Sequence, residues 1–169
     1  MAKRIFDTTV ALIGLIILAP IFAVIAILIK LDSPGPVFFR GKRVGQHEKV
    51  FYILKFRSMV SDAPQKGPVI TCKDDPRITR IGSVLRKTKL DELPSLVNVL
   101  KGEMSLVGPR SERPSLVNKL QKKVPFYRAR LLVKPGVTGW AQINYGYPET
   151  IDETIDKLEN DLFYIKNRS

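Results

Sequence analysis

The longest apolar stretch of the chain lies near its N-terminus, where the twenty residues Val10–Ile29 carry no charge. This length is typical of a helix that crosses a bilayer. Pro20, however, stands at the midpoint, and an interior proline bends or breaks a helix. Each arm is then about ten residues or roughly 15 Å long, about half of a ~30 Å hydrocarbon core. The pattern predicts either a helix-break-helix that enters and leaves by one membrane face, or a single span that is merely kinked.

Basic residues flank the apolar stretch on both sides. Lys3 and Arg4 precede it, and Lys30 and Arg40 are among those that follow. Because basic flanks favour the cytoplasmic side, both ends are expected there, and the re-entrant arrangement is favoured. We therefore expect residues 1–32 to form a re-entrant membrane-anchoring helical hairpin, and residues 33–169 to form a cytosolic domain. Asp7 is expected to pair with Lys3 one helical turn away.

The rest of the chain alternates short strand and helix patterns. Two aromatic and β-branched runs, Val37–Phe39 and Val50–Leu54, flank a segment rich in Gly and Lys, which predicts a β-hairpin. A loop is expected over Ser61–Asp75. Further elements are expected as helices from Pro76, near Pro94, over Ser115–Lys123 and after the capping box at Thr150. Residues 134–145 are expected to form a Gly-rich turn that enters a strand. The predicted class is α+β, mostly helical, with a small hairpin.

Charge narrows the possible partners of this domain. Lys and Arg number 28 against 16 acidic residues, a formal charge of +12, which implies an anionic partner: nucleic acid, an anionic membrane face or a phosphorylated substrate. Nucleic acid is disfavoured because the basic residues are spread along the chain and no recognised binding motif appears. A single Cys excludes an internal disulfide, and a single His cannot build a zinc site with it.

Two adjacent carboxylates, Asp91 and Glu92, lie in a neighbourhood otherwise rich in cations. They precede Pro94, which fits the first turn of a helix, so they are either capping acids or an acid pair that handles phosphate. Arg110 follows a Gly-Pro turn and is a candidate clamp for phosphate oxygens. Lys55 and Arg57 share one face of the second strand, either as a solvated face or as binding groups for an anion.

Taken together, these segments resemble the bacterial sugar transferase family, the monotopic phosphoglycosyl transferases. The resemblance is carried, in chain order, by Lys30–Phe38, Lys55–Met59, Arg77–Gly82, Leu90–Pro94, Lys101–Arg110 and Pro135–Trp140. These motifs cover nearly the whole chain in order, which makes the combined match specific. One departure is Ala19-Pro20, where family members often carry Ser-Pro.

The resemblance implies transfer of a phosphosugar from a UDP-sugar to polyprenyl (undecaprenyl) phosphate, giving polyprenyl-diphosphate sugar and UMP. This would be the initiating step of glycoconjugate synthesis. By the same resemblance Asp91 is the nucleophile that forms a covalent phosphosugar intermediate, and Glu92 is a ligand of Mg²⁺. Arg110, Lys55 and Arg57 are expected to bind substrate phosphate. The expected location is the inner leaflet of the bacterial inner (cytoplasmic) membrane, with the catalytic domain, 33–169, facing the cytoplasm.

Two alternatives remain open at this level. The chain could be a non-catalytic membrane-surface protein that binds anionic lipid through its basic face. It could also catalyse the same transfer by direct attack of the lipid phosphate, without a covalent step.

Overall fold

The computed structural model of the protein describes residues 2–63, 75–144 and 150–167. They form an α+β structure with mostly helical content, a long apolar N-terminal helix and a small antiparallel hairpin, as the sequence predicts. The greater part of the predicted loop Ser61–Asp75 lies outside the described residues.

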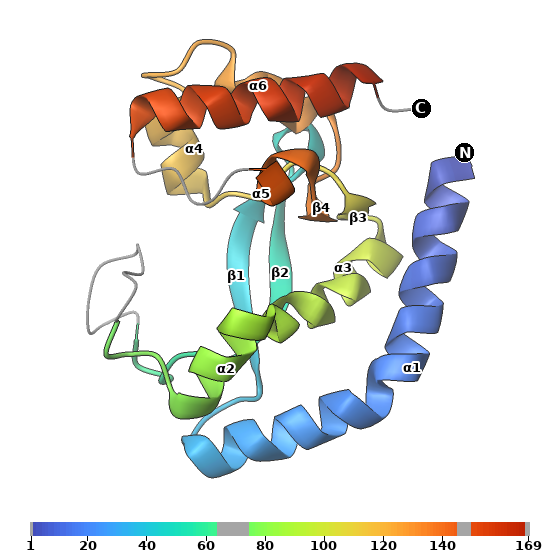
Figure 1. Cartoon of the computed structure of the whole chain (residues 1–169), viewed down its shortest axis with the longest axis vertical. Coiled ribbons are helices and arrows are strands. Elements are labelled where there is room, and N and C mark those ends of the chain that lie inside the picture. The colour runs from blue at the N-terminus through green and yellow to red at the C-terminus, as the bar shows by residue number, and fades with distance from the viewer. Residues whose placement is uncertain (1, 64–74, 145–149, 168–169) are drawn as a thin grey trace.

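Helix α1, Ala2–Asp32, is a single helix that contains Pro20 and changes direction near its middle (Figure 1). The expected helix-break-helix is thus a bend within one helix, because a proline removes only one N–H and the turns on either side remain helical. By length and composition α1 could cross a membrane.

One stripe of α1 packs against the rest of the protein. Its residues recur every three or four positions, as expected for one face of a helix: Ala11, Leu15, Leu18, Phe22, Ile25 and Ile29. Most of the other large apolar side chains of α1 are exposed, among them Ile16 and Ile17 at 66% and 65%. Exposed apolar area on this scale indicates a face that is covered by something other than water.

The N-terminal end of α1 is held to the domain by polar contacts. Asp7 is buried, and its Oδ2 accepts a hydrogen bond from Ser105 Oγ at 2.8 Å. Lys3 Nζ donates to the same Ser105 Oγ at 2.7 Å and lies 3.4 Å from Asp7 Oδ1, which confirms the predicted Lys3–Asp7 pair. The Arg4 guanidinium donates to the carbonyls of Val99 and Leu100, at 2.5 and 2.8 Å.

The C-terminal end of α1 is held as firmly. Arg57 is 5% exposed, and its guanidinium donates to the carbonyl oxygens of Ser33 and Pro34 at 2.6 and 2.5 Å. The Asp32 carboxylate accepts from the backbone N–H of Ile81 at 3.0 Å. Both ends of the bent helix are therefore bonded to one and the same domain.

The predicted hairpin is confirmed as strands β1, Phe38–Val44, and β2, Val50–Phe56, which pair antiparallel in the register Phe38↔Phe56. A short 3-10 turn, Gln46–Glu48, joins them. A second pair was not predicted: β3, Ser105–Val107, lies parallel to β4, Gly136–Thr138. These strands have three residues each, too few to show a period in the sequence.

The remaining elements are helical. In chain order they are α2 (Arg80–Thr88), a 3-10 helix (Leu90–Ser95), α3 (Leu96–Lys101), α4 (Pro114–Leu120), a 3-10 helix (Tyr127–Leu132), α5 (Trp140–Asn144) and α6 (Ile151–Asn167). The capping box is present, since the Thr150 hydroxyl accepts from the N–H of Glu153 at 3.1 Å. Within 134–145, where a Gly-rich turn and a strand are expected, the strand is confined to β4 and helix α5 follows, because the Gly139 carbonyl accepts from the N–H groups of Gln142 and Ile143.

The buried apolar side chains of the described residues form three clusters. One joins the N-terminal arm of α1 to α3 and β2 around Ala11, Phe51 and Val99. A second joins the C-terminal arm of α1 to Phe56 and α2. The third lies beneath α4 and α6, around Val117. Because α1 contributes to two of the three, it is part of the folded core as well as a candidate membrane anchor.

Helix α2 approaches the backbone after β2 so closely that only glycine fits at the contact. A Cβ built on Gly82 would lie 2.1 Å from the carbonyl oxygen of Ser58, a backbone atom that cannot swing aside. At Gly14 in α1, by contrast, the nearest neighbour of a built Cβ is the Leu96 side chain at 3.4 Å.

We expect Gly82→Ala to destabilise the protein by about 1–3 kcal/mol, because α2 must move away from Ser58. The matched variant Gly14→Ala is expected to be neutral or stabilising, since alanine favours a helix by about 1 kcal/mol over glycine. Thermal unfolding in detergent measures both. Equal Tm losses for the two variants would contradict the close approach.

Candidate active site

The acid pair lies at the corner where α2 ends and α3 begins. Lys89, in the left-handed region at φ 61°, terminates α2, and the chain restarts as the 3-10 helix that contains Asp91 and Glu92. Leu90, the residue before the pair, packs on the cluster formed with the C-terminal arm of α1. In Figure 1, α2 and α3 run between the two arms of α1. The acid pair therefore lies on the side of the domain that packs against α1.

Glu92 is bound by two cations from distant parts of the chain. Its Oε1 accepts from Lys55 Nζ at 2.6 Å and from Arg110 Nη2 at 2.9 Å. Burial alone would raise the pKa of Glu92, but Arg110 and Lys55 outweigh it and lower the pKa to about 2. Glu92 is thus held as a carboxylate. The structure brings together three of the five predicted site residues here, and Asp91 adjoins them.

Asp91 has a different environment from its neighbour. It is 8% exposed, and its Oδ1 is buried without a hydrogen-bond partner among the described residues. Burial is the main cause that raises the pKa of Asp91; Lys55 opposes the rise and Glu92 adds to it. A carboxylate oxygen that is poorly solvated and not hydrogen bonded is a stronger nucleophile than a paired one. Of the two acids, Asp91 is the one suited to attack.

The segment that carries Arg110 is fixed by the short parallel strands. The Gly136 N–H donates to the Pro109 carbonyl at 2.9 Å, and the Gly108 N–H donates to the Thr138 carbonyl at 2.9 Å. A Cβ built on Gly108 would lie 2.4 Å from the Lys134 carbonyl oxygen, so the turn requires glycine. The rigid Gly-Pro turn expected from the sequence is present and aims Arg110 at Glu92.

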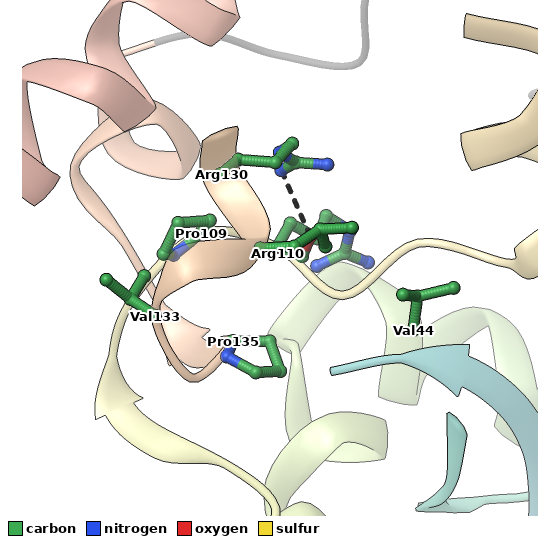
Figure 2. A pocket seen from close by; sticks show the side chains of 7 residues that line it. Val44, Pro109, Arg110, Arg130, Val133 and Pro135 are labelled. Carbon is green, nitrogen blue, oxygen red and sulfur yellow. Dashed lines mark hydrogen bonds between the residues drawn. The ribbon is translucent and has the colours of Figure 1, made fainter. Parts of the chain in front are cut away.

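Two further contacts hold Arg110. Its Nη1 donates to Gln142 Oε1 at 2.9 Å. Its main-chain oxygen accepts from Arg130 Nη2 at 3.0 Å, the dashed line in Figure 2. The small pocket drawn in Figure 2 is lined mainly by apolar side chains around Arg110 and Arg130, such as Val44 and Pro135. We interpret it as packing behind Arg110 rather than as a place for substrate.

Arg57 is not brought to the acid pair. It follows the last residue of β2 and is used to bind the exit of α1, as described above. Its expected partnership with Lys55 on one strand face requires the strand to continue through residue 57, and β2 ends at Phe56. Lys55 therefore points to the site, and Arg57 to the helix end.

Sequence reasoning did not single out Gln142 or Arg86 as site residues. Gln142 lies on α5, where a strand was expected, so no helical face could be assigned to it. Arg86 is on α2, its Nε donates to Ser58 Oγ at 2.9 Å, and its charge acts on Asp91. Arg86 and Asp91 are separated by the end of α2 at Lys89, so helical spacing in the sequence does not place them side by side.

The donor set can be compared with the requirements of Mg²⁺. Among residues 2–63, 75–144 and 150–167, no three His, Cys, Asp or Glu side chains gather into a group that could hold a metal ion. Mg²⁺ commonly uses one or two protein carboxylates and completes its shell with substrate phosphates and water. An ionised Glu92 beside a buried, unpartnered Asp91 oxygen fits that requirement.

An acid pair largely removed from water, with one carboxylate clamped by a lysine and an arginine, defines a class of site that is chemically suited to phosphate-bearing ligands. The model of the bacterial sugar transferase family matches residues 1–169, and the chain belongs to this family.

Relatives with assigned names agree with this membership. An Aeromonas hydrophila protein named UDP-N-acetylgalactosamine-undecaprenyl-phosphate N-acetylgalactosaminephosphotransferase is 46% identical over 99% of this chain and 40% of its own length. An Escherichia coli K12 protein named UDP-glucose:undecaprenyl-phosphate glucose-1-phosphate transferase is 41% identical over 100% and 37%. An exopolysaccharide production protein of Rhizobium leguminosarum is 43% identical over 99% and 86%. The chain thus spans about two fifths of the first two proteins.

Replacing each acid by its amide is expected to change the stability of the fold in opposite directions, downward for Glu92 and upward for Asp91. Because the pKa of Glu92 falls from 4.5 to about 2 on folding, its ionised form stabilises the fold above about pH 4.5. That stability is lost as the pH falls toward 2. Glu92→Gln should therefore lower stability at pH 7, on the order of 2–3 kcal/mol.

For Asp91 the pKa is raised on folding, so the stability that its protonated form gives is lost as the pH rises through the folded pKa. Asp91→Asn is expected to unfold at a higher Tm than the parent protein at pH 7, measured in EDTA. A lower Tm for Asp91→Asn would show that its carboxylate is stabilised rather than strained.

Proposed function

We propose that this protein transfers a sugar 1-phosphate from a UDP-sugar to polyprenyl phosphate, releasing UMP, as the initiating step of glycoconjugate synthesis. The single observation that carries the proposal is the contrast within the acid pair. Glu92 is bound by Lys55 and Arg110, whereas Asp91 is buried and its Oδ1 has no hydrogen-bond partner among the described residues. Membership of the bacterial sugar transferase family and the names of the relatives agree with it.

In the first half-reaction an Asp91 carboxylate oxygen attacks the phosphorus that bears the sugar. A P–O bond forms to Asp91, the diphosphate P–O bond breaks, and its electron pair leaves with UMP. In the second half-reaction an oxygen of polyprenyl phosphate attacks the same phosphorus, and the Asp91 carboxylate is released. Atoms and charges balance in both steps without an oxidant or a proton donor. The covalent intermediate thus replaces one difficult transfer step by two easier ones.

Lys55 and Arg110 supply the charge that such an attack requires. A carboxylate approaches a diphosphate only where negative charge is offset by fixed cations. Both cations are bonded to Glu92 in this structure, so an arriving diphosphate would take over donors that are already oriented. Arg86, whose charge acts on Asp91, is a third candidate for a phosphate oxygen.

Mg²⁺ is the cofactor that we propose, with Glu92 as its protein ligand. When bound, the ion would neutralise diphosphate oxygens and so make the phosphorus a better electrophile. The protein's own contribution is to keep Glu92 ionised, since the low pKa set by Arg110 and Lys55 leaves its carboxylate available at any physiological pH.

We further propose that α1 is re-entrant and anchors the domain to the inner leaflet of the cytoplasmic membrane. A straight span would place Lys3 and Lys30 on opposite faces of the bilayer. Yet residues at both ends of α1, Asp7 and Asp32 among them, are bonded to the same domain. With the domain on the cytoplasmic face, the acid pair would lie near the headgroups, where the phosphate of polyprenyl phosphate resides.

The catalytic role of Asp91 is tested by Asp91→Asn. We expect UMP release from a panel of UDP-sugars with undecaprenyl phosphate and Mg²⁺ to fall by about 1,000-fold or more, because the amide cannot form the covalent intermediate. The panel includes UDP-N-acetylgalactosamine and UDP-glucose. Asp156→Asn changes an exposed acid on α6 and is expected to retain full activity.

Mass spectrometry of the parent protein incubated with UDP-sugar alone separates the two catalytic routes. A phosphosugar adduct on Asp91 supports the covalent step, and its absence from active protein supports direct attack by the lipid phosphate. Unchanged activity of Asp91→Asn would contradict any catalytic role. Binding to anionic vesicles without UMP release by the parent would favour the non-catalytic alternative.

The re-entrant arrangement is tested with single cysteines in a Cys72→Ser background. Ala2→Cys and Lys42→Cys place exposed thiols before and after α1. Because both ends are bonded to one domain, we expect a membrane-impermeant maleimide to label both from the cytoplasmic side of inverted vesicles and neither from the outside of intact spheroplasts. Labelling of the two thiols from opposite sides would establish a simple span.

A further inference from the structure

Helix α6 lies far from the acid pair in sequence, yet a buried chain of charges links it to Arg110. Asp161, in the middle of α6, is 3% exposed, and its Oδ2 lies 2.7 Å from Arg130 Nη2 and accepts from Arg130 Nε at 3.0 Å. Arg130 is likewise 3% exposed. Its Nη1 donates to the Tyr127 hydroxyl at 2.9 Å, and its Nη2 donates to the Arg110 carbonyl at 3.0 Å.

The contacts from Asp161 through Arg130 to Arg110 are more elaborate than the attachment of α6 to the domain requires. Burying an ion pair costs desolvation energy, and a well-packed apolar pair often stabilises a helix contact as well or better. An arginine adds a rigid fork that can bond two acceptors in fixed directions at once. Here the Arg130 guanidinium is bound by Asp161 and also donates to the main-chain oxygen of Arg110. The side chain of Arg110 in turn binds Glu92.

Arg110 is consequently fixed at its backbone as well as at its tip. The neighbouring backbone is paired with β4, where Gly136 N–H donates to the Pro109 carbonyl. The tip is bonded to Glu92 and Gln142. Arg130 adds a further contact, to the Arg110 carbonyl oxygen (Figure 2). A side chain as long as arginine is aimed reproducibly only if its backbone is fixed.

We infer that Asp161 and Arg130 are positioning residues for the transfer: through the Arg110 carbonyl, they set the placement of the Arg110 guanidinium on the substrate diphosphate. This inference rests on the proposed function. It assigns α6 a role in the active site, exerted on Glu92 through Arg130 and Arg110. Small displacements of a charge-stabilising group reduce rates strongly, since an error of about 1 Å can cost on the order of 100-fold.

A double-mutant cycle tests the inference. Asp161→Asn keeps the shape of the side chain and removes the charge that fixes Arg130, and Arg110→Ala removes the group that is positioned. We expect Asp161→Asn to lower kcat for UMP release and the calorimetric affinity for UDP by about 10-fold or more in the parent background. In the Arg110→Ala background the same change should cost less than about 2-fold.

Thermal unfolding separates positioning from simple support of the fold. Asp161→Asn is expected to lower Tm by the same amount in both backgrounds, while its effect on UDP affinity appears only when Arg110 is present. Glu159→Gln, an exposed acid on the same helix, is the matched control and should change neither quantity. If Asp161→Asn fails to fold, Arg130→Lys, which keeps the charge but lacks the fork, replaces it in the same cycle.

The outcomes are distinct. Parent protein that neither binds UDP nor releases UMP would overturn the proposed function. Active parent protein in which the Asp161 and Arg110 effects multiply independently would overturn the positioning role and leave the proposed function standing. Loss of the Asp161 effect in Arg110→Ala supports the inference.

Discussion

The ion pairs of Glu92 are the contacts on which the rest of the site depends. Lys55 comes from β2, Glu92 from the corner before α3, and Arg110 from the turn after β3, so one carboxylate joins three separate parts of the chain. These groups are largely removed from water, and charges in such a place are tolerated only together, because any one of them left alone would be an unpaired buried charge. The same distances that stabilise the fold therefore bring the chemically useful groups within reach of one substrate.

The two neighbouring acids show how a fold can stabilise one group and strain another at the same spot. Burial acts against ionisation of both. At Glu92 it is overcome by direct bonds to two cations, whereas Asp91 Oδ1 has no hydrogen-bond partner among the described residues. Strain of this kind is found at functional sites, where the surrounding structure supplies the stability that the reactive group lacks. The difference also explains why adjacent, chemically similar residues can have unlike roles.

Much of the architecture could be predicted from periodicity, and part of the site could not. The twenty-residue apolar run and the flanking aromatic strands identify α1 and the hairpin because their patterns are long. Lys55 and Arg57 could not be told apart by alternation, since that rule holds only while the strand continues, and β2 ends between them. Gln142 was missed because five residues of helix after a glycine turn are too short to show a helical period. Such local decisions depend on contacts distant in sequence.

The bend of α1 is governed by more than its proline. Pro20 weakens one turn, but a kink can open in several directions and to several degrees. What selects one geometry is that the same helix face packs along both arms, and that Asp7 and Asp32 bond the domain at either end. The helix is thus bent to the shape of the domain. A serine before Pro20 would add only a local bond, so the alanine at position 19 does not prevent the bend. The place of the acid pair relative to the two arms of α1 is therefore set by the packing of the helix against α2 and α3.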